Sequence, residues 1–131
     1  MTQRTNISSG SPLEPVFGYS RAVRVGDQVF VSGTTSVQPD GSVAGGSDAY
    51  AQAKAALETI EQALREAGAN LNEVVRTRIY VTDMRDLDAV GRAHAESFGD
   101  VRPACTGVEV TALARPGMIV EIEADAIIGA A

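Results

Sequence analysis

The residues with the clearest chemical potential lie in the last third of the chain. Cys105 is the single cysteine. Three carboxylates then alternate with apolar residues, at Glu121, Glu123 and Asp125. A thiolate can act as a nucleophile, and a carboxylate can relay protons during hydrolysis of a polarised carbon. Taken alone, the alternation indicates that the three carboxylates share the solvated face of a strand.

The composition does not support metal chemistry. One histidine, His94, and one cysteine are too few ligands for a self-contained zinc site, and a lone cysteine cannot form an internal disulfide. His94 falls on the apolar stripe of an expected helix, so a packed or interface histidine is favoured over a nucleophilic pair with Cys105. We therefore expect no metal site.

The length and net charge of the chain indicate a single domain and argue against some classes of binding partner. The 131 residues and 44% hydrophobic content suit one domain with a single core. The 17 acidic and 11 basic side chains give a net charge of -6, which argues against nucleic acid as a partner. Apolar runs are much shorter than the ~20 residues that cross a bilayer, and the first residues lack the apolar core of a signal peptide. We expect a cytoplasmic protein that does not bind membranes.

The chemical residues must be positioned by a set of short strands. Alternating or continuous apolar runs predict strands at 20–25, 28–32, 74–81, 104–110 and 119–128. Gly26 and Asp27 join the first two as a hairpin. In the third strand, alternation predicts one face made of Val75, Thr77, Ile79 and Val81.

Helical spacing predicts two helices between these strands. The first covers 48–67, with Ser47 as its N-terminal cap and Gly68 after its end. Asp86 caps the second, which ends at Gly99. This order predicts an α+β domain over 16–131, in which two helices cover one face of a mixed, mostly antiparallel sheet. Residues 1–15 lack periodicity and are expected to form a loose arm, either laid over the domain or disordered.

Several short motifs occur in a specific order along nearly the whole chain from about Phe17. They are Gly18-Tyr19-Ser20 with Ala22, Val31-Ser32-Gly33, Ala67-Gly68-Ala69, Val74-Val75-Arg76-Thr77, Tyr80-Val81-Thr82-Asp83, Arg102-Pro103-Ala104, and Glu121-Ile122-Glu123-Ala124. Together they resemble the RidA/YjgF family of small trimeric imine deaminases. The resemblance implies a chorismate-mutase-like fold, a homotrimer whose sheets form an inner barrel, and small-molecule pockets between subunits. It also implies hydrolysis of enamines or imines such as 2-aminoacrylate to a 2-keto acid and ammonia, without a cofactor.

The resemblance assigns roles to particular residues. Glu121 matches the family's site glutamate, and Tyr19 matches a tyrosine that lines the pocket. Gly33 and Gly107 fall on strands where a missing side chain allows a ligand to approach the backbone. Bulges and close strand packing explain such glycines equally often, and we interpret these two as pocket walls.

Two positions depart from the family pattern. Cys105 replaces an arginine that binds a substrate carboxylate, and Gly91 replaces a frequent asparagine. A buried, inert thiol and a thiol exposed to ligand are both compatible with the sequence at position 105. The missing cation has three candidate substitutes, namely Arg21, Arg102 and Arg115.

These observations leave several functions open. The leading hypothesis is hydrolysis of a small imine or enamine, with Glu121 managing the water and a substrate class altered from 2-aminoacrylate. The alternative is a non-catalytic metabolite-binding or regulatory protein, which the missing arginine favours. Holdase and ribonuclease activities are also reported in the family. The acidic charge argues against a ribonuclease, and no sequence feature tests a holdase.

Overall fold

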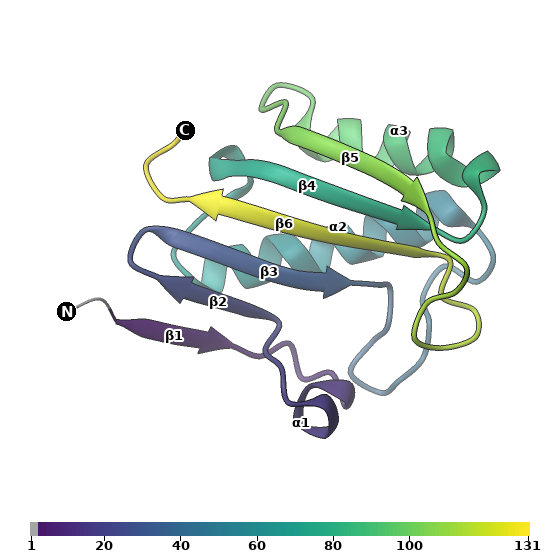
Figure 1. Cartoon of the computed structure of the whole chain (residues 1–131), viewed down its shortest axis with the longest axis horizontal. Helices are drawn as coiled ribbons and strands as arrows, with labels where there is room; N and C mark the ends of the chain where they lie inside the picture. Colours follow the sequence, from purple (N-terminus) through teal and green to yellow (C-terminus); the bar gives the residue numbers. More distant parts are fainter. Residues whose placement is uncertain (1–2) are drawn as a thin grey trace.

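The computed structural model describes residues 3–131 and shows one mixed sheet with two long helices on the same face (Figure 1). The strands are β1 (Arg4–Ile7), β2 (Ala22–Val25), β3 (Gln28–Thr34), β4 (Val74–Val81), β5 (Ala104–Glu109) and β6 (Val120–Ile127). The helices are α1 (Leu13–Phe17), α2 (Ala49–Glu66) and α3 (Leu87–Phe98), with short 3-10 turns η1 (Leu71–Glu73) and η2 (Met84–Asp86).

The strand order is β1-β2-β3-β6-β4-β5. All neighbours pair antiparallel except β4 and β5, which are parallel and are joined by α3 as a crossover helix. The predicted α+β class and the mostly antiparallel sheet are therefore confirmed. Within residues 3–131, no helix has both the length and the apolar character that crossing a membrane requires.

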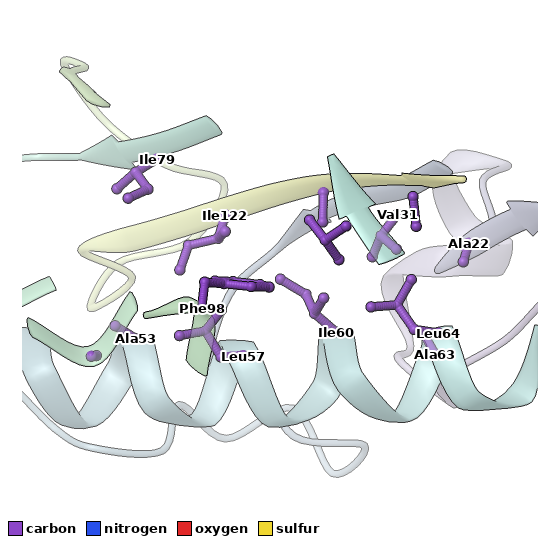
Figure 2. Close-up of a cluster of buried hydrophobic side chains, with 14 of the residues drawn as sticks. Ala22, Val31, Ala53, Leu57, Ile60, Ala63, Leu64, Ile79, Phe98 and Ile122 are labelled. Carbon is purple, nitrogen blue, oxygen red and sulfur yellow. The ribbon is translucent and has the colours of Figure 1, made fainter. Parts of the chain in front are cut away.

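The core lies between the sheet and α2 and α3. Figure 2 shows Leu57, Ile60 and Leu64 pointing from α2 toward the sheet, where Ile122 of β6 faces them. Along β6 the residues alternate, so that Val120, Ile122, Ala124 and Ala126 are buried beneath the helices. The intervening acidic residues therefore point to the opposite face of the sheet, which no helix covers (Figure 1).

The expectation of a loose arm is wrong for its described part, residues 3–15. β1 pairs antiparallel with β2, and Ile7 lies opposite Ala22 on the core side. α1 follows and buries Glu14, which is 4% exposed. So short a strand and so short a helix produce no periodic signal, which is why the sequence pattern does not reveal them. Residues 1–2 of the expected arm lie outside the described residues.

Three local expectations are also wrong. Asp48, not Ser47, caps α2, because its Oδ1 accepts a hydrogen bond from the Ala51 backbone N–H at 3.2 Å. Asp86 makes no side-chain cap, because the chain has already turned in η2, which Asp83 caps through the Arg85 N–H at 2.9 Å.

The third incorrect expectation concerns the predicted buried face of β4. A register shift between Val74 and Arg76 buries Val74 and leaves Val75 37% exposed, whereas the remaining residues of the predicted face are buried.

The largest fully buried side chain tests whether this core holds the fold together. Phe98 is 2% exposed, so Phe98→Ala should lower the free energy of unfolding by about 3–5 kcal/mol through lost burial and a cavity. The control is Met84→Ala, at a side chain that is 42% exposed, which should change it by about 0.5 kcal/mol or less. Chemical denaturation followed by circular dichroism measures both, and equal effects would contradict this assignment of the core.

Candidate functional site

Three of the residues predicted from the sequence lie around one cavity. Tyr19, Gly33 and Glu121 line a cavity of about 200 Å³ between the N-terminal segment, the end of β3 and the loop before β6. Phe17 and Arg21 line it as well. Residues nearly a hundred positions apart in the sequence are thus brought together by the antiparallel pairing of β3 with β6.

Glu121 lies on the uncovered face of β6, beside Tyr80 of β4. Burial raises the pKa of the Glu121 carboxyl above its ordinary value, with a smaller raising effect from Glu123 and an opposing effect from the Arg21 cation. A partly buried carboxyl whose pKa is raised can both accept and return a proton near neutral pH more readily than an ordinary glutamate.

Gly33 makes room for this carboxylate. A Cβ placed on Gly33 would lie 2.5 Å from Glu121 Oε2 and 2.9 Å from its Cδ, closer than real contacts allow. The pairing of β3 with β6 shifts register between Val31 and Thr34, so the irregular part of β3 faces Glu121. Gly33 therefore acts as a pocket wall by letting the Glu121 side chain lie against the backbone.

Arg21 is the buried cation of the cavity, at 4% exposure. Its Nη1 donates to the Gly33 carbonyl at 2.7 Å and to Thr34 Oγ1 at 2.8 Å. Its Nη2 donates to the Tyr19 hydroxyl at 3.2 Å, and the guanidinium carbon lies 5.4 Å from the centre of the Tyr19 ring. Of the three arginines considered as substitutes for the family's cation, Arg21 is the one that points inward.

Glu14, which the sequence analysis did not single out, does not line the cavity but contacts Arg21, which does. Its Oε2 lies 3.8 Å from Arg21 Nε and accepts from the Ser9 hydroxyl at 2.5 Å and the Ser9 N–H at 3.2 Å. Burial, the largest single influence, would raise the pKa of Glu14, but hydrogen bonds from Ser9 and Ser8 and the Arg21 charge together lower it. Its sequence signal is an acidic residue within the first turn of a short helix, in a segment whose pattern predicts a loose arm.

A second cavity lies on the other side of Glu121. It has a volume of about 290 Å³ and is lined by Gly33, Tyr80, Glu121 and Glu123 among others. The Tyr80 hydroxyl donates a hydrogen bond to Glu123, which raises the pKa of Tyr80. Glu121 therefore lines both cavities, whereas the carboxylate of Glu123 accepts a hydrogen bond from Tyr80 of β4.

Three predicted site residues do not join this pocket within one chain. Cys105 and Gly107 pair with Thr77 and Ile79, whose side chains are buried on the helix side of the sheet, opposite to Glu121. A Cβ at Gly107 would lie 3.0 Å from a methyl group of Leu87, on that same side. Cys105 is exposed, so the alternative of a buried inert thiol is wrong for the single chain.

Gly91 lies on an exposed part of α3. An added Cβ there would meet nothing within 4 Å. Arg102 and Arg115, the other two arginines considered as substitutes for the family's cation, are exposed. The guanidinium carbon of Arg115 lies 5.9 Å from the ring centre of Phe17, a residue that lines the first cavity.

His94 behaves as a packed residue. Its Nε2 lies 2.8 Å from Thr77 Oγ1, its ring lies 4.7 Å from that of Phe98, and burial lowers its pKa. Among residues 3–131, no group of three or more histidine, cysteine, aspartate or glutamate side chains could hold a metal ion.

The close approach of Gly33 to Glu121 can be tested without a substrate. Gly33→Ala should push the Glu121 carboxylate toward solvent and return its pKa toward the ordinary value, because burial is the main cause of the increase. NMR titration of isotope-labelled glutamate carboxyls measures this. Gly107→Ala is the matched control on another strand. An unchanged Glu121 pKa in Gly33→Ala would contradict the geometry.

Known proteins share both sequence and structure with this chain. The family model described as Endoribonuclease L-PSP matches residues 10–128. The structure is similar to a crystal structure from Mycobacterium tuberculosis of a member of the highly conserved YjgF/YER057c/UK114 family, with a TM-score of 0.87, 53% identity, and coverage of 96% of this chain and 100% of that chain.

Two named relatives add to this result. The chain is 34% identical over 126 residues to the Mus musculus 2-iminobutanoate/2-iminopropanoate deaminase, covering 96% of this chain and 93% of that protein. It is 33% identical over 122 residues to the 3-aminoacrylate deaminase RutC of Acinetobacter baylyi, covering 93% of this chain and 95% of that protein. The chain therefore belongs to the YjgF/RidA family, which is also described as endoribonuclease L-PSP.

Proposed function

We propose that this protein hydrolyses a small imine or enamine in the pocket of Tyr19, Gly33 and Glu121. The observation that carries the proposal is a carboxyl with a raised pKa, half-buried beside a cavity that can hold a small metabolite. The names of the mouse and Acinetobacter relatives, both deaminases of imino or enamino acids, support the reaction class.

The reaction needs a proton to move from water to nitrogen. Water adds to the carbon of the C=N bond, and the Glu121 carboxylate accepts the proton that the water loses. Glu121 returns this proton to nitrogen, which gives a carbinolamine that carries a hydroxyl and an amino group on one carbon. Glu121 then accepts the hydroxyl proton and passes it to the amino nitrogen, so that the C–N bond breaks as the C=O bond forms and ammonia leaves. An enamine enters the same route after protonation at carbon converts it to the imine.

Tyr19 is placed to orient the ligand. Its hydroxyl oxygen accepts a hydrogen bond from Arg21 Nη2, which leaves the hydroxyl hydrogen free to donate to a ligand. The aromatic ring supplies an apolar wall on the same side of the cavity. This chain's own residues thus supply a proton carrier, a donor and a wall without a cofactor.

The substrate class differs from 2-aminoacrylate in this proposal. A thiol at position 105 cannot make the paired, charge-assisted hydrogen bonds with which a guanidinium binds a carboxylate. The same substitution favours the alternative function, a pocket that binds a metabolite and does not turn it over.

We also propose a homotrimer, in which β5 of a neighbouring subunit completes the pocket. On the uncovered face of the sheet, large apolar side chains are exposed in the single chain: Val25, Phe30, Val108 and Ile127. Association of subunits through this face would remove these side chains from water.

Replacing the proposed proton carrier tests catalysis. Glu121→Gln keeps the shape of the side chain but cannot accept a proton, so kcat should fall by at least about 100-fold. Imines generated in situ from an amino acid and from a simple amine by an oxidase, with ammonia release as the readout, supply both substrate types. Asp125→Asn, on the same strand and face, is the matched control.

The pH profile of the unmodified protein should agree with this role. Because the base form of Glu121 is required, kcat/KM should fall as the pH drops through the raised pKa, above the usual range of a glutamate. The acid limb should disappear in Glu121→Gln. Equal turnover in the mutant would exclude Glu121 as the proton carrier. Turnover no faster than the uncatalysed rate in the unchanged protein would favour the binding-protein alternative.

The assembly has its own test. Multi-angle light scattering at micromolar concentration should give three times the 13.6 kDa mass of the chain. Phe30→Glu, on the uncovered face, should shift the protein toward monomer, because it introduces a charge into the proposed contact. A monomer for the unchanged protein would remove the proposed intersubunit pocket.

A further inference from the structure

The cation at the base of the pocket is already engaged by the protein. Arg21 makes hydrogen bonds to Gly33, Thr34 and Tyr19, which use three of the five N–H donors that a guanidinium carries. The cation is therefore held firmly in the cavity wall, and it reaches any ligand mainly through its charge.

That charge has a dedicated counter-ion. Glu14 Oε2 lies 3.8 Å from Arg21 Nε, and both side chains are only 5% exposed, so water screens the pair weakly. Ser9 fixes the carboxylate through its hydroxyl and its N–H. Arg21 Nε is buried without a hydrogen-bond partner, which indicates that Glu14 acts on Arg21 through charge and not through a direct hydrogen bond.

The remaining charges near the cavity are mostly negative. Glu121 lines it, and Glu123 is close enough to raise the Glu121 pKa. The cation of Arg78 lies 3.4 Å from Asp125 and is thus engaged. Arg115, which contacts Phe17, is exposed, so water screens its charge. The charge of Arg21 acts on both Glu14 and Glu121, so two carboxylates share this one cation. The wall that this chain contributes therefore carries no excess positive charge apart from the exposed Arg115.

We infer that the buried Glu14–Arg21 pair sets the charge preference of the pocket, which selects neutral or cationic imines and disfavours those that carry a carboxylate. Only the identification of the ligand as an imine rests on the proposed function. The charge preference itself applies to any small ligand of the pocket. A carboxylate in the cavity would lie against Glu121, whose own pKa is already raised by the nearby Glu123, whereas an uncharged imine or an iminium ion would not be repelled. Glu14 is thus a specificity-determining residue that acts through Arg21.

Three isosteric probes that differ only in charge test this preference. Isobutyrate, isobutyramide and isobutyramidinium have the same heavy-atom shape and carry negative, zero and positive charge. NMR chemical-shift titration at neutral pH measures their dissociation constants in the millimolar range. The amide and the amidinium should each bind at least about tenfold more tightly than the carboxylate. Equal or tighter binding of isobutyrate, or no binding of any probe, would overturn the inference.

Variants of the pair should change the preference in opposite directions. Glu14→Gln frees the Arg21 charge, so isobutyrate should bind about tenfold more tightly and isobutyramide should change less than about twofold. Arg21→Gln removes the cation and should weaken isobutyrate further. Changing both residues together should restore the ranking of the unchanged protein. Glu61→Gln removes a carboxylate from an exposed pair with Arg65 on α2 and is the matched control.

The outcomes separate this inference from the proposed function. If the probe ranking and its response to Glu14→Gln hold but no imine is hydrolysed, the reaction is wrong and the charge preference stands. If imines are hydrolysed but Glu14→Gln leaves the ranking unchanged, or Glu61→Gln alters it equally, the inference is wrong. Should Glu14→Gln fail to fold by circular dichroism, the opposite response of Arg21→Gln and the ranking in the double variant decide the question.

Discussion

The Arg21 guanidinium joins the parts of the chain on which the pocket depends. One nitrogen binds the end of β3, another holds the Tyr19 hydroxyl, and the third faces a carboxylate from the N-terminal segment. A planar group with fixed donor directions suits this task, because it sets the relative orientation of its partners as well as their distance. Burial makes the arrangement costly to break, since an unpaired buried charge is strongly destabilising. The pocket wall is therefore an electrostatic structure as much as a packed one.

The sheet places the candidate site and the hydrophobic core on opposite faces. Alternation along β6 directs Ile122 and its apolar neighbours to α2 and α3 and directs Glu121 to the other face. The irregular pairing of β3 and the missing side chain at Gly33 then allow the carboxylate to lie against the strand. Burial of Glu121 is thus obtained on a face that has no helix over it.

Sequence patterns predicted most of the fold because strong periodicity reports burial directly. The strands around Gly26, the strand beginning at Val74, and both long helices were found within a few residues, as was Gly68, whose positive φ of 88° follows the end of α2. β1 and α1 were missed, because elements of four or five residues bury too little to create a period. The exposure of Val75 is not predicted, because a bulge moves a side chain to the other face of the sheet without any change in the local sequence pattern.

The candidate site was predictable only in part for a related reason. Tyr19, Gly33 and Glu121 were found through motif resemblance, and the structure brings them together. Glu14 has no motif of its own, and its role depends on a three-dimensional contact with Arg21 that no local pattern encodes. The side of the sheet on which Cys105 lies depends on the parallel register of β5 with β4, which a single-strand pattern does not specify.

The Glu14–Arg21 contact has an evolutionary consequence. Loss of either partner alone leaves an uncompensated charge inside the protein, whereas loss of both leaves a neutral wall. Substitutions at positions 14 and 21 should therefore be tolerated mainly as joint changes, so the two sites should covary in descendants of this chain. A lineage that escapes this coupling by retaining only the cation would acquire a pocket suited to anions. A change in substrate range could thus arise from one substitution in α1, a helix that contributes little else to the sheet or the core.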